Sequence, residues 1–193
     1  MKIICLGDSL TYGFAMARRD TWVSLTAEKT GFEIINKGIN GDTTGGMIAR
    51  FERDVLRENP SAVIAVGGAN DIFTSQTSAN ARSNIFAMLN LASANKILFI
   101  TGSLLPIDLD NVRTDWASFT DMESAQGCCL SYNIWLSSFC KIFKTPFIDF
   151  NAAFSASADT NLYLEDGLHP NAEGHKIMAE TACAKLLEIF KKK

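Results

Sequence analysis

Short apolar runs alternate along the chain with longer segments in which polar and apolar residues are mixed. Five of these runs are rich in β-branched or aromatic residues and are apolar along most of their length. That pattern is typical of strands that are covered on both faces. We therefore predict strands at Lys2–Leu6, Phe32–Lys37, Ala62–Val66, Lys96–Thr101 and Phe147–Asp149.

The segments between these runs carry helix signals. Asn171 is a good N-cap for the last segment, with Glu173 near its start and lysines after its end, in agreement with the helix dipole. Pro60 ends an earlier segment, because proline disfavours the helical conformation in the residue before it. The predicted helices are Thr21–Thr30, Thr44–Asn59, Asn80–Ala94, Asp121–Phe143 and Asn171–Lys191.

Strand and helix alternate almost to the end of the chain, which predicts an α/β fold with a parallel sheet, helices on both faces and right-handed crossovers. The length of 193 residues suits one domain, and no linker or repeat divides residues 1–193. One long irregular segment is expected at Gly102–Thr120. Loops of that length are commonly functional, so it is either a wall or lid over a site or a surface excursion anchored by Trp116.

Composition narrows the function classes. With 47% hydrophobic and 20% charged residues the chain resembles an ordinary soluble globular protein, and a net charge of -3 gives no reason to expect a nucleic-acid partner. The apolar runs are too short to span a bilayer. The chain opens directly into the first predicted strand without a signal-peptide pattern, so we expect a cytosolic protein unless a signal peptide has been removed.

The five cysteines form no C-x-x-C pattern, and their number is odd. Neither a disulfide framework nor a zinc site is indicated. Cys5 is most simply a core residue, whereas the adjacent pair Cys128-Cys129 leaves a redox role open. The loop after the first strand lacks the glycine patterns of dinucleotide and phosphate sites, so no flavin or nucleotide cofactor is expected.

Four polar clusters follow a predicted strand or precede a predicted helix. In a parallel sheet the carboxyl ends of the strands lie at the same edge, so clusters that are distant in sequence converge there. The clusters are Gly7-Asp8-Ser9-Leu10, Asn40-Gly41-Asp42, Gly67-Gly68-Ala69-Asn70-Asp71 and Asp166-Gly167-Leu168-His169-Pro170.

The chain has two histidines, and His169 is the candidate general base, because it lies in a loop flanked by glycine and proline. Asp166, three residues earlier, can accept a hydrogen bond from the imidazole and fix its tautomer. An isolated D-x-x-H is more often a capped turn with a structural histidine. The other histidine, His175, lies inside the last helix, where we expect it to face solvent or to pack.

Ser9 is a candidate nucleophile, although a serine in this place also serves as a helix cap or an anion contact. The backbone N–H groups of Ser9 and Gly41 and the side-chain amide of Asn70 are the donors that an oxyanion hole needs. A cap, a plain turn and a close backbone approach would each explain one of these residues. Their joint occurrence at successive strand ends favours catalysis.

At these residues the sequence resembles the SGNH hydrolases, also called GDSL lipases or esterases. The resemblance runs from Gly7–Leu10 through Gly68–Asp71 to Asp166–Pro170 and covers nearly the whole chain. The serine, glycine, asparagine and histidine that give the family its name fall on Ser9, Gly41, Asn70 and His169. The α/β-hydrolase pattern fits less well, because Ser9 lies near the start of the chain and no glycine follows at position 11.

The resemblance implies a flavodoxin-like three-layer α/β/α sandwich with a five-stranded sheet in the order 2-1-3-4-5. It also implies hydrolysis of small-molecule carboxylic esters through a Ser9–His169–Asp166 triad and an acyl-enzyme, without cofactor or metal. Within the family we expect short or medium acyl chains, as in lysophospholipases or thioesterases, with removal of acetyl groups from sugars as the alternative. Val66 and Gly102–Thr120 are expected to shape the acyl pocket.

Two other function classes stay open at the level of sequence. Four aspartates could surround a cation in a metal-dependent phosphoesterase. These are Asp8, Asp42, Asp71 and Asp166. The other alternative is a binding module without enzymatic activity, in which the Ser9 loop holds an anion at a helix N-terminus. The sequence does not specify an oligomeric state.

Overall fold

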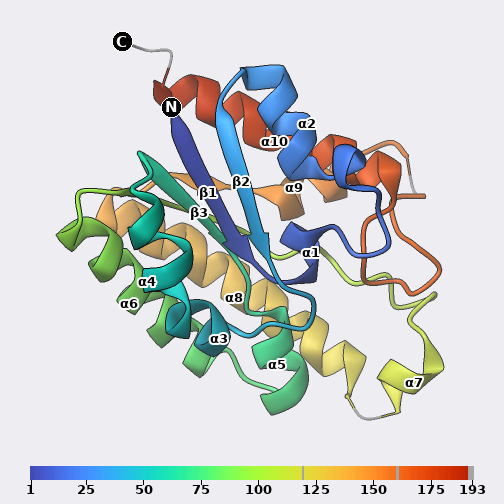
Figure 1. Ribbon diagram of the computed structural model, residues 1–193. Helices are drawn as coiled ribbons and strands as arrows, with labels where there is room; N and C mark the ends of the chain where they lie inside the picture. Colours follow the sequence, from blue (N-terminus) through green and yellow to red (C-terminus); the bar gives the residue numbers. More distant parts are fainter. Residues whose placement is uncertain (119, 160, 191–193) are drawn as a thin grey trace.

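The computed structural model describes residues 1–118, 120–159 and 161–190 and contains a single five-stranded parallel sheet (Figure 1). The strand order is β2-β1-β3-β4-β5, and every neighbouring pair is parallel, so the fold expected from the sequence is confirmed. The strands are β1 (Lys2–Gly7), β2 (Glu33–Gly38), β3 (Ala62–Val66), β4 (Leu98–Gly102) and β5 (Phe147–Ile148).

Helices cover both faces of the sheet and form the outer layers (Figure 1). On one face lie α2 (Trp22–Thr30), α9 (Phe150–Ser155) and α10 (Ala172–Phe190), and on the other lie α3 (Thr44–Ala49), α4 (Phe51–Asp54), α6 (Ala79–Ala94) and α8 (Met122–Phe143). The short helices are α1 (Ser9–Tyr12), α5 (Ala69–Ser75) and α7 (Thr114–Ala117), with 3-10 turns at Arg18–Asp20 and Leu56–Glu58.

Alternation along the strands divides the core between the two faces. In β1, Ile4 and Leu6 pack towards α3, α6 and α8, whereas Ile3 and Cys5 pack towards α2 and α10. All four side chains are inaccessible to solvent. Cys5 is thus the core residue that the sequence predicts, and burial raises the pKa of its thiol.

The predicted helix Thr44–Asn59 is wrong as a continuous element. It consists of α3, α4 and the turn Leu56–Glu58, and the break after α3 falls at Arg50, whose backbone angles (φ -102°, ψ 5°) leave the helical range. Arg50 is buried there by contacts with distant strands, described below. A local sequence pattern contains no sign of those contacts.

Other differences from the predicted elements are smaller. β4 begins at Leu98, because Lys96 adopts a left-handed conformation (φ 59°) after α6. β5 ends before Asp149, which caps α9 instead. The predicted end of the last helix, Lys191, lies outside the described residues. Four helices of four to seven residues were not predicted, because elements this short show little periodicity: α1, α5, α7 and α9.

The cysteines are free thiols, so Cys128 and Cys129 form no vicinal disulfide. Burial, together with the neighbouring Cys128, raises the pKa of Cys129 to about 12, which disfavours a reactive thiolate. Among the described helices, none has the length and apolarity needed to cross a membrane.

The carboxyl ends of the strands point to one edge of the sheet, the lower edge in Figure 1. α1 follows β1 there, the loop before α3 follows β2, and α5 follows β3. Three of the four polar clusters predicted from the sequence lie on these connections, and the fourth, Asp166–Pro170, lies between α9 and α10.

Candidate active site

Ser9 and His169, 160 positions apart in the chain, meet at this edge. The Oγ of Ser9 lies 2.9 Å from Nε2 of His169. Ser9 is the first residue of α1, and the carboxylate of Asp8 caps that helix by accepting the Leu10 N–H at 3.0 Å. The sharp entry into α1 requires Gly7, because a Cβ at that position would lie 2.4 Å from the carbonyl oxygen of Val66.

The second ring nitrogen of His169, Nδ1, lies 2.6 Å from Oδ2 of Asp166. The other carboxylate oxygen accepts the backbone N–H groups of Leu168 and His169 at 3.0 and 2.9 Å. Gly167 permits this tight turn, since its φ is 69°. The carboxylate is therefore fixed against the imidazole by the fold of its own loop.

Burial raises the pKa of Asp166, but the hydrogen bonds from the backbone and ring of His169 and from Leu168 outweigh it, so the pKa is below the ordinary value. Asp166 is ionised at neutral pH and can only accept a hydrogen bond. The hydrogen of the neutral imidazole consequently lies on Nδ1, and Nε2 is left to accept the hydroxyl hydrogen of Ser9.

Phe14, which the sequence did not single out, covers the imidazole of His169. The two ring centroids are 4.4 Å apart, and the planes are inclined by 33°. His169 is only 8% exposed. The ring is thus held on three sides, by Asp166, Ser9 and Phe14.

Gly41 and Asn70 lie beside the same cavity as Ser9 and His169. Gly41 has a φ of 73°, a left-handed conformation that residues other than glycine rarely adopt. The space around it is open, since a Cβ there would meet no atom within 4 Å. Asn70 is on the first turn of α5, and its Nδ2 donates to the backbone oxygen of Asp42 at 2.8 Å. The structure thus brings all five predicted site residues to one place.

The cavity has a volume of about 320 Å³, and its walls are mainly apolar. The segment 102–120, expected to form a wall or lid, lines the cavity with five of its residues, 104–107 and Trp116. Part of this segment is the short helix α7 rather than irregular chain. Phe119, in the same segment, lies outside the described residues. Val66 does not line the cavity but packs in the core on the α10 side, contrary to our expectation. The apolar and aromatic lining comprises Leu10, Phe14, Ala69, Phe73, Leu104, Leu105, Pro106, Ile107, Trp116 and Leu168.

Polar contacts hold the part of this wall between Leu104 and Asp108 at each of its ends. The side chain of Asn133 on α8 accepts the Leu104 N–H at 2.8 Å and donates to the Leu104 carbonyl at 3.0 Å. Further along, the Asp108 N–H donates to the carbonyl of Gly167 at 2.9 Å. The wall is therefore joined directly to the loop that carries His169.

Comparison with known proteins places this geometry in a family. The profile of the GDSL-like Lipase/Acylhydrolase family matches residues 5–177. The chain belongs to this family. The match extends from the first strand into the last helix and includes every site residue described above.

Two curated relatives of this chain carry esterase names. An arylesterase of Vibrio mimicus is 36% identical over 75 residues, which are 36% of this chain and 38% of the relative. Esterase TesA of Pseudomonas aeruginosa is 26% identical over 111 residues, 54% of this chain and 55% of the relative. The matches thus span only a third to about half of these curated relatives.

Two solved structures resemble this chain over all or nearly all of its length. A lipolytic protein of the G-D-S-L family from Desulfitobacterium hafniense superposes with a TM-score of 0.81 at 25% identity, covering 95% of this chain and 98% of the other. One from Veillonella parvula gives the same TM-score and identity with both chains fully covered.

The four aspartates considered as cation ligands have separate partners in the structure. Asp42 pairs with Arg50 at 2.8 Å, and Asp71 accepts the backbone N–H and the hydroxyl of Thr44 at 2.9 and 2.6 Å. Asp8 and Asp166 make the contacts described above. Among the described residues, no group of three or more His, Cys, Asp or Glu side chains could hold a metal. This arrangement gives the phosphoesterase alternative no support.

Asp8 is the one acidic group at the site with an unsatisfied atom. It is 1% exposed, and its Oδ2 has no hydrogen-bond partner among the described residues. Burial above all, opposed by the Leu10 N–H and aided by the nearby Asp42 and Asp71, raises its pKa to about 7. A full negative charge beside the serine is thereby disfavoured below neutral pH.

Proposed function

We propose that this protein is a serine esterase that hydrolyses carboxylic esters through an acyl-enzyme on Ser9. The observation that carries the proposal is the continuous chain from Ser9 Oγ to His169 Nε2 at 2.9 Å and from Nδ1 to Asp166 at 2.6 Å. His169 takes the hydroxyl proton as Oγ attacks the ester carbonyl. Asp166 stabilises the imidazolium that forms and keeps the ring oriented.

The negative charge on the carbonyl oxygen needs donors that are in place before the reaction. We assign this role to the backbone N–H groups of Ser9 and Gly41 and to the Asn70 amide. His169 then protonates the leaving alcohol, so the C–O bond breaks and the acyl group stays on Ser9. Water attacks this acyl-enzyme while His169 takes its proton, and the acid is released with Ser9 restored.

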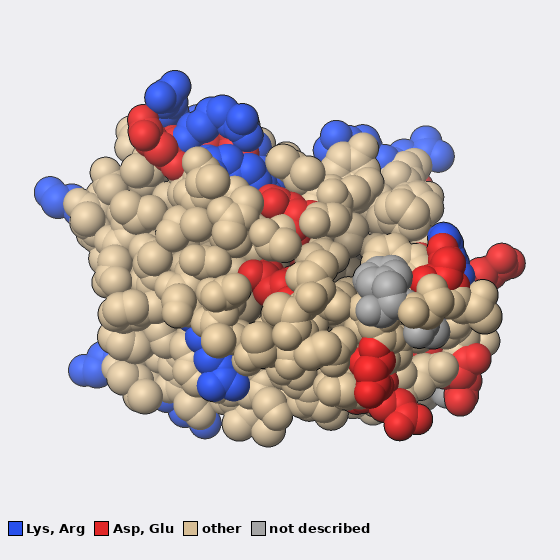
Figure 2. Space-filling view, turned by 90° about the horizontal axis from the view of Figure 1, so that it is seen from below, with Lys and Arg blue, Asp and Glu red and all other residues tan. Residues whose placement is uncertain are grey.

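The cavity supports a neutral, apolar acyl group as the substrate part that is bound. Its walls are aliphatic and aromatic, and its volume of about 320 Å³ suits a short or medium chain. Most of the face that surrounds the strand ends carries no charged side chains (Figure 2). A lysophospholipid, a thioester or a simple ester would present such a chain.

An acetyl group on a sugar would leave most of this apolar volume empty, so no observation favours the O-acetylesterase alternative. The cytosolic location and the single-domain organisation of residues 1–193 stay predictions.

The experiment is a hydrolysis series on p-nitrophenyl esters from acetate to dodecanoate, with an acyl thioester and an acetylated xylan in parallel. We expect kcat/KM to peak at a short or medium chain and the activity to vanish in Ser9→Ala, with an unchanged circular dichroism spectrum. Activity retained in Ser9→Ala, or no ester hydrolysed above background, would contradict the esterase. A preference for the acetylated xylan would shift the substrate class to sugar acetates.

A further inference from the structure

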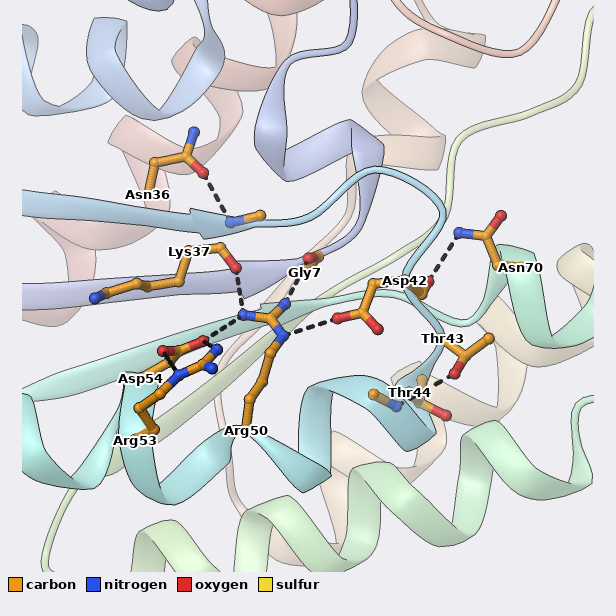
Figure 3. Close-up of polar contacts among 12 residues, drawn as sticks. Gly7, Asn36, Lys37, Asp42, Thr43, Thr44, Arg50, Arg53, Asp54 and Asn70 are labelled. Atoms are coloured by element: carbon orange, nitrogen blue, oxygen red, sulfur yellow. Dashed lines mark hydrogen bonds and ion pairs between the residues drawn. The ribbon is translucent and has the colours of Figure 1, made fainter.

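Arg50 contacts four separate parts of the chain, among them Gly7 and Asp42, which are close in sequence to the candidate site residues Ser9 and Gly41 (Figure 3). Its side chain is only 8% exposed. The guanidinium donates to the backbone carbonyls of Gly7 and Lys37 at 2.9 and 2.7 Å, near the carboxyl ends of β1 and β2. It also donates to the carboxylates of Asp42 and Asp54 at 2.8 and 2.9 Å.

The two carboxylates have similar environments but different connections. Their side chains are 12% and 10% exposed for Asp42 and Asp54. Asp54 is also paired with Arg53 at 2.7 Å, and hydrogen bonds from Arg53 and Arg50 lower its pKa to about 2. Arg53 and Asp54 are at the opposite side of the guanidinium from Asn70 (Figure 3).

Asp42 connects the guanidinium to the site. Its backbone carbonyl accepts Nδ2 of Asn70 at 2.8 Å, while its carboxylate is held by Arg50. The preceding residue is Gly41, the other predicted oxyanion donor outside α1. Asp42 is thus hydrogen-bonded to Arg50 through its side chain and to Asn70 through its backbone carbonyl (Figure 3).

We propose that Arg50 and Asp42 are positioning residues that hold the Asn70 amide in the orientation needed to donate to the oxyanion. The inference rests on the proposed esterase function. The amide of Asn70 is planar, so once one N–H is bonded to Asp42 the direction of the second is set. Donors act strongly on a developing charge only when they are fixed beforehand.

The geometry explains why an arginine occupies this position. The guanidinium offers five N–H donors in a planar fork, and here they reach acceptors on both strands and both carboxylates. A lysine has one nitrogen and could not span these directions at once.

The first test compares Asp42→Ala with Asp54→Ala, since both remove a buried partner of the same guanidinium. We expect kcat to fall about ten- to hundredfold in Asp42→Ala with little change in KM, because misplacing a catalytic group by about 1 Å costs up to a hundredfold. Asp54→Ala should lower the melting temperature and leave kcat within about twofold. Asp42→Asn keeps an oxygen for Arg50 and should recover part of the loss.

Two adjacent glycines give a test that changes no charge. A Cβ at Gly46 would lie 1.8 Å from Oδ1 of Asp42 and force the carboxylate to move. A Cβ at Gly45 would meet only ordinary contacts, the nearest being Thr43 Oγ1 at 3.5 Å. Both residues are in α3, so the two variants change helix propensity alike. Because only the Cβ at position 46 displaces the Asp42 carboxylate, Gly46→Ala should lower kcat and Gly45→Ala should not.

A double-mutant cycle decides whether the effect passes through Asn70. If it does, Asp42→Ala lowers kcat by a much smaller factor in an Asn70→Ala background than in the wild type. Three results would overturn the inference. The kcat losses of Asp42→Ala and Asn70→Ala could multiply in the double variant, or Asp42→Ala and Asp54→Ala could lower kcat equally. The third is an unchanged kcat in both Asp42→Ala and Gly46→Ala. Each of these results requires an active wild type, whereas failure of the esterase proposal appears as an inactive wild type or an active Ser9→Ala.

Discussion

His169 and His175 are six residues apart and both buried, yet their surroundings differ completely. His169 has a carboxylate on Nδ1 and the Ser9 hydroxyl on Nε2. His175, inside α10, accepts the backbone N–H of Trp22 through Nδ1 at 3.1 Å, and its Nε2 has no partner among the described residues. Burial, followed by repulsion from His169, lowers the pKa of His175 to about 4.

The comparison shows that the partners of a histidine, rather than its burial, decide what it can do. A neutral imidazole that accepts a backbone N–H has a structural role in joining α10 to the start of α2. An imidazole between a carboxylate and a hydroxyl can take up a proton and return it. The following predictions test this contrast.

The largest effect is expected for His169→Ala. Loss of the proposed general base should lower kcat by at least about 10⁴-fold, as for the corresponding removal in other serine hydrolases. The matched variant is His175→Asn, which should keep kcat within about twofold. Steady-state kinetics on the best p-nitrophenyl ester checks both, and similar losses in the two variants would remove the distinction.

Asp166→Asn should lower kcat by about 10⁴-fold, because an amide can donate to Nδ1 and stabilise the wrong tautomer. Asp121→Asn is the control, since Asp121 also accepts a backbone N–H, that of Ser124, but only caps α8. If Asp166 merely caps its turn, the two variants should differ little in kcat.

Asp8→Asn should change how stability depends on pH. The folded pKa of about 7 lies above the ordinary value of 3.8, so the contribution of Asp8 to stability is complete below pH 4 and is lost as pH rises to 7. Three pKa units correspond to about 4 kcal/mol. Relative to wild type, the unfolding free energy of Asp8→Asn should therefore rise between pH 4 and 7. Urea unfolding across this range measures it, and a constant difference would mean that Asp8 is ionised throughout.

His175→Asn should change the pH dependence of the unfolding free energy in the opposite sense. The folded pKa of about 4 lies below the ordinary 6.5, so the contribution of His175 is complete above pH 6.5 and is lost as pH falls to 4. Two and a half pKa units correspond to about 3 kcal/mol. Compared with wild type, His175→Asn should lose less stability on acidification. Because the Asp8 and His175 slopes oppose each other, the variants Asp8→Asn and His175→Asn reveal effects that largely cancel in the wild type.

The sequence was most informative where local pattern and tertiary role agree. Strand β3 was predicted to the residue, because Ala62–Val66 is wholly apolar and buried on both faces. Ser9, Asp166 and His169 could be named from motifs, since each lies in a turn whose glycines are needed locally. The helices that carry Ser9 and Asn70 were missed, as they are too short to show a period.

What the sequence could not predict depends on contacts between distant segments. From the sequence, Asp42 was considered as a member of a polar cluster and as a cation ligand, whereas it pairs with Arg50, whose other acceptors include Gly7, 43 positions away. Phe14 against His169 and the apolar wall at 104–107 are likewise products of the fold. A local pattern contains none of these pairings.

The most direct measurement of the central claim, that His169 activates Ser9, is the rate and site of labelling by a fluorophosphonate. The account predicts a single phosphonyl adduct on Ser9 in the wild type and a labelling rate at least about a hundredfold lower in His169→Ala, with His175→Asn labelled like the wild type. Labelling of another residue, or an undiminished rate in His169→Ala, would contradict it.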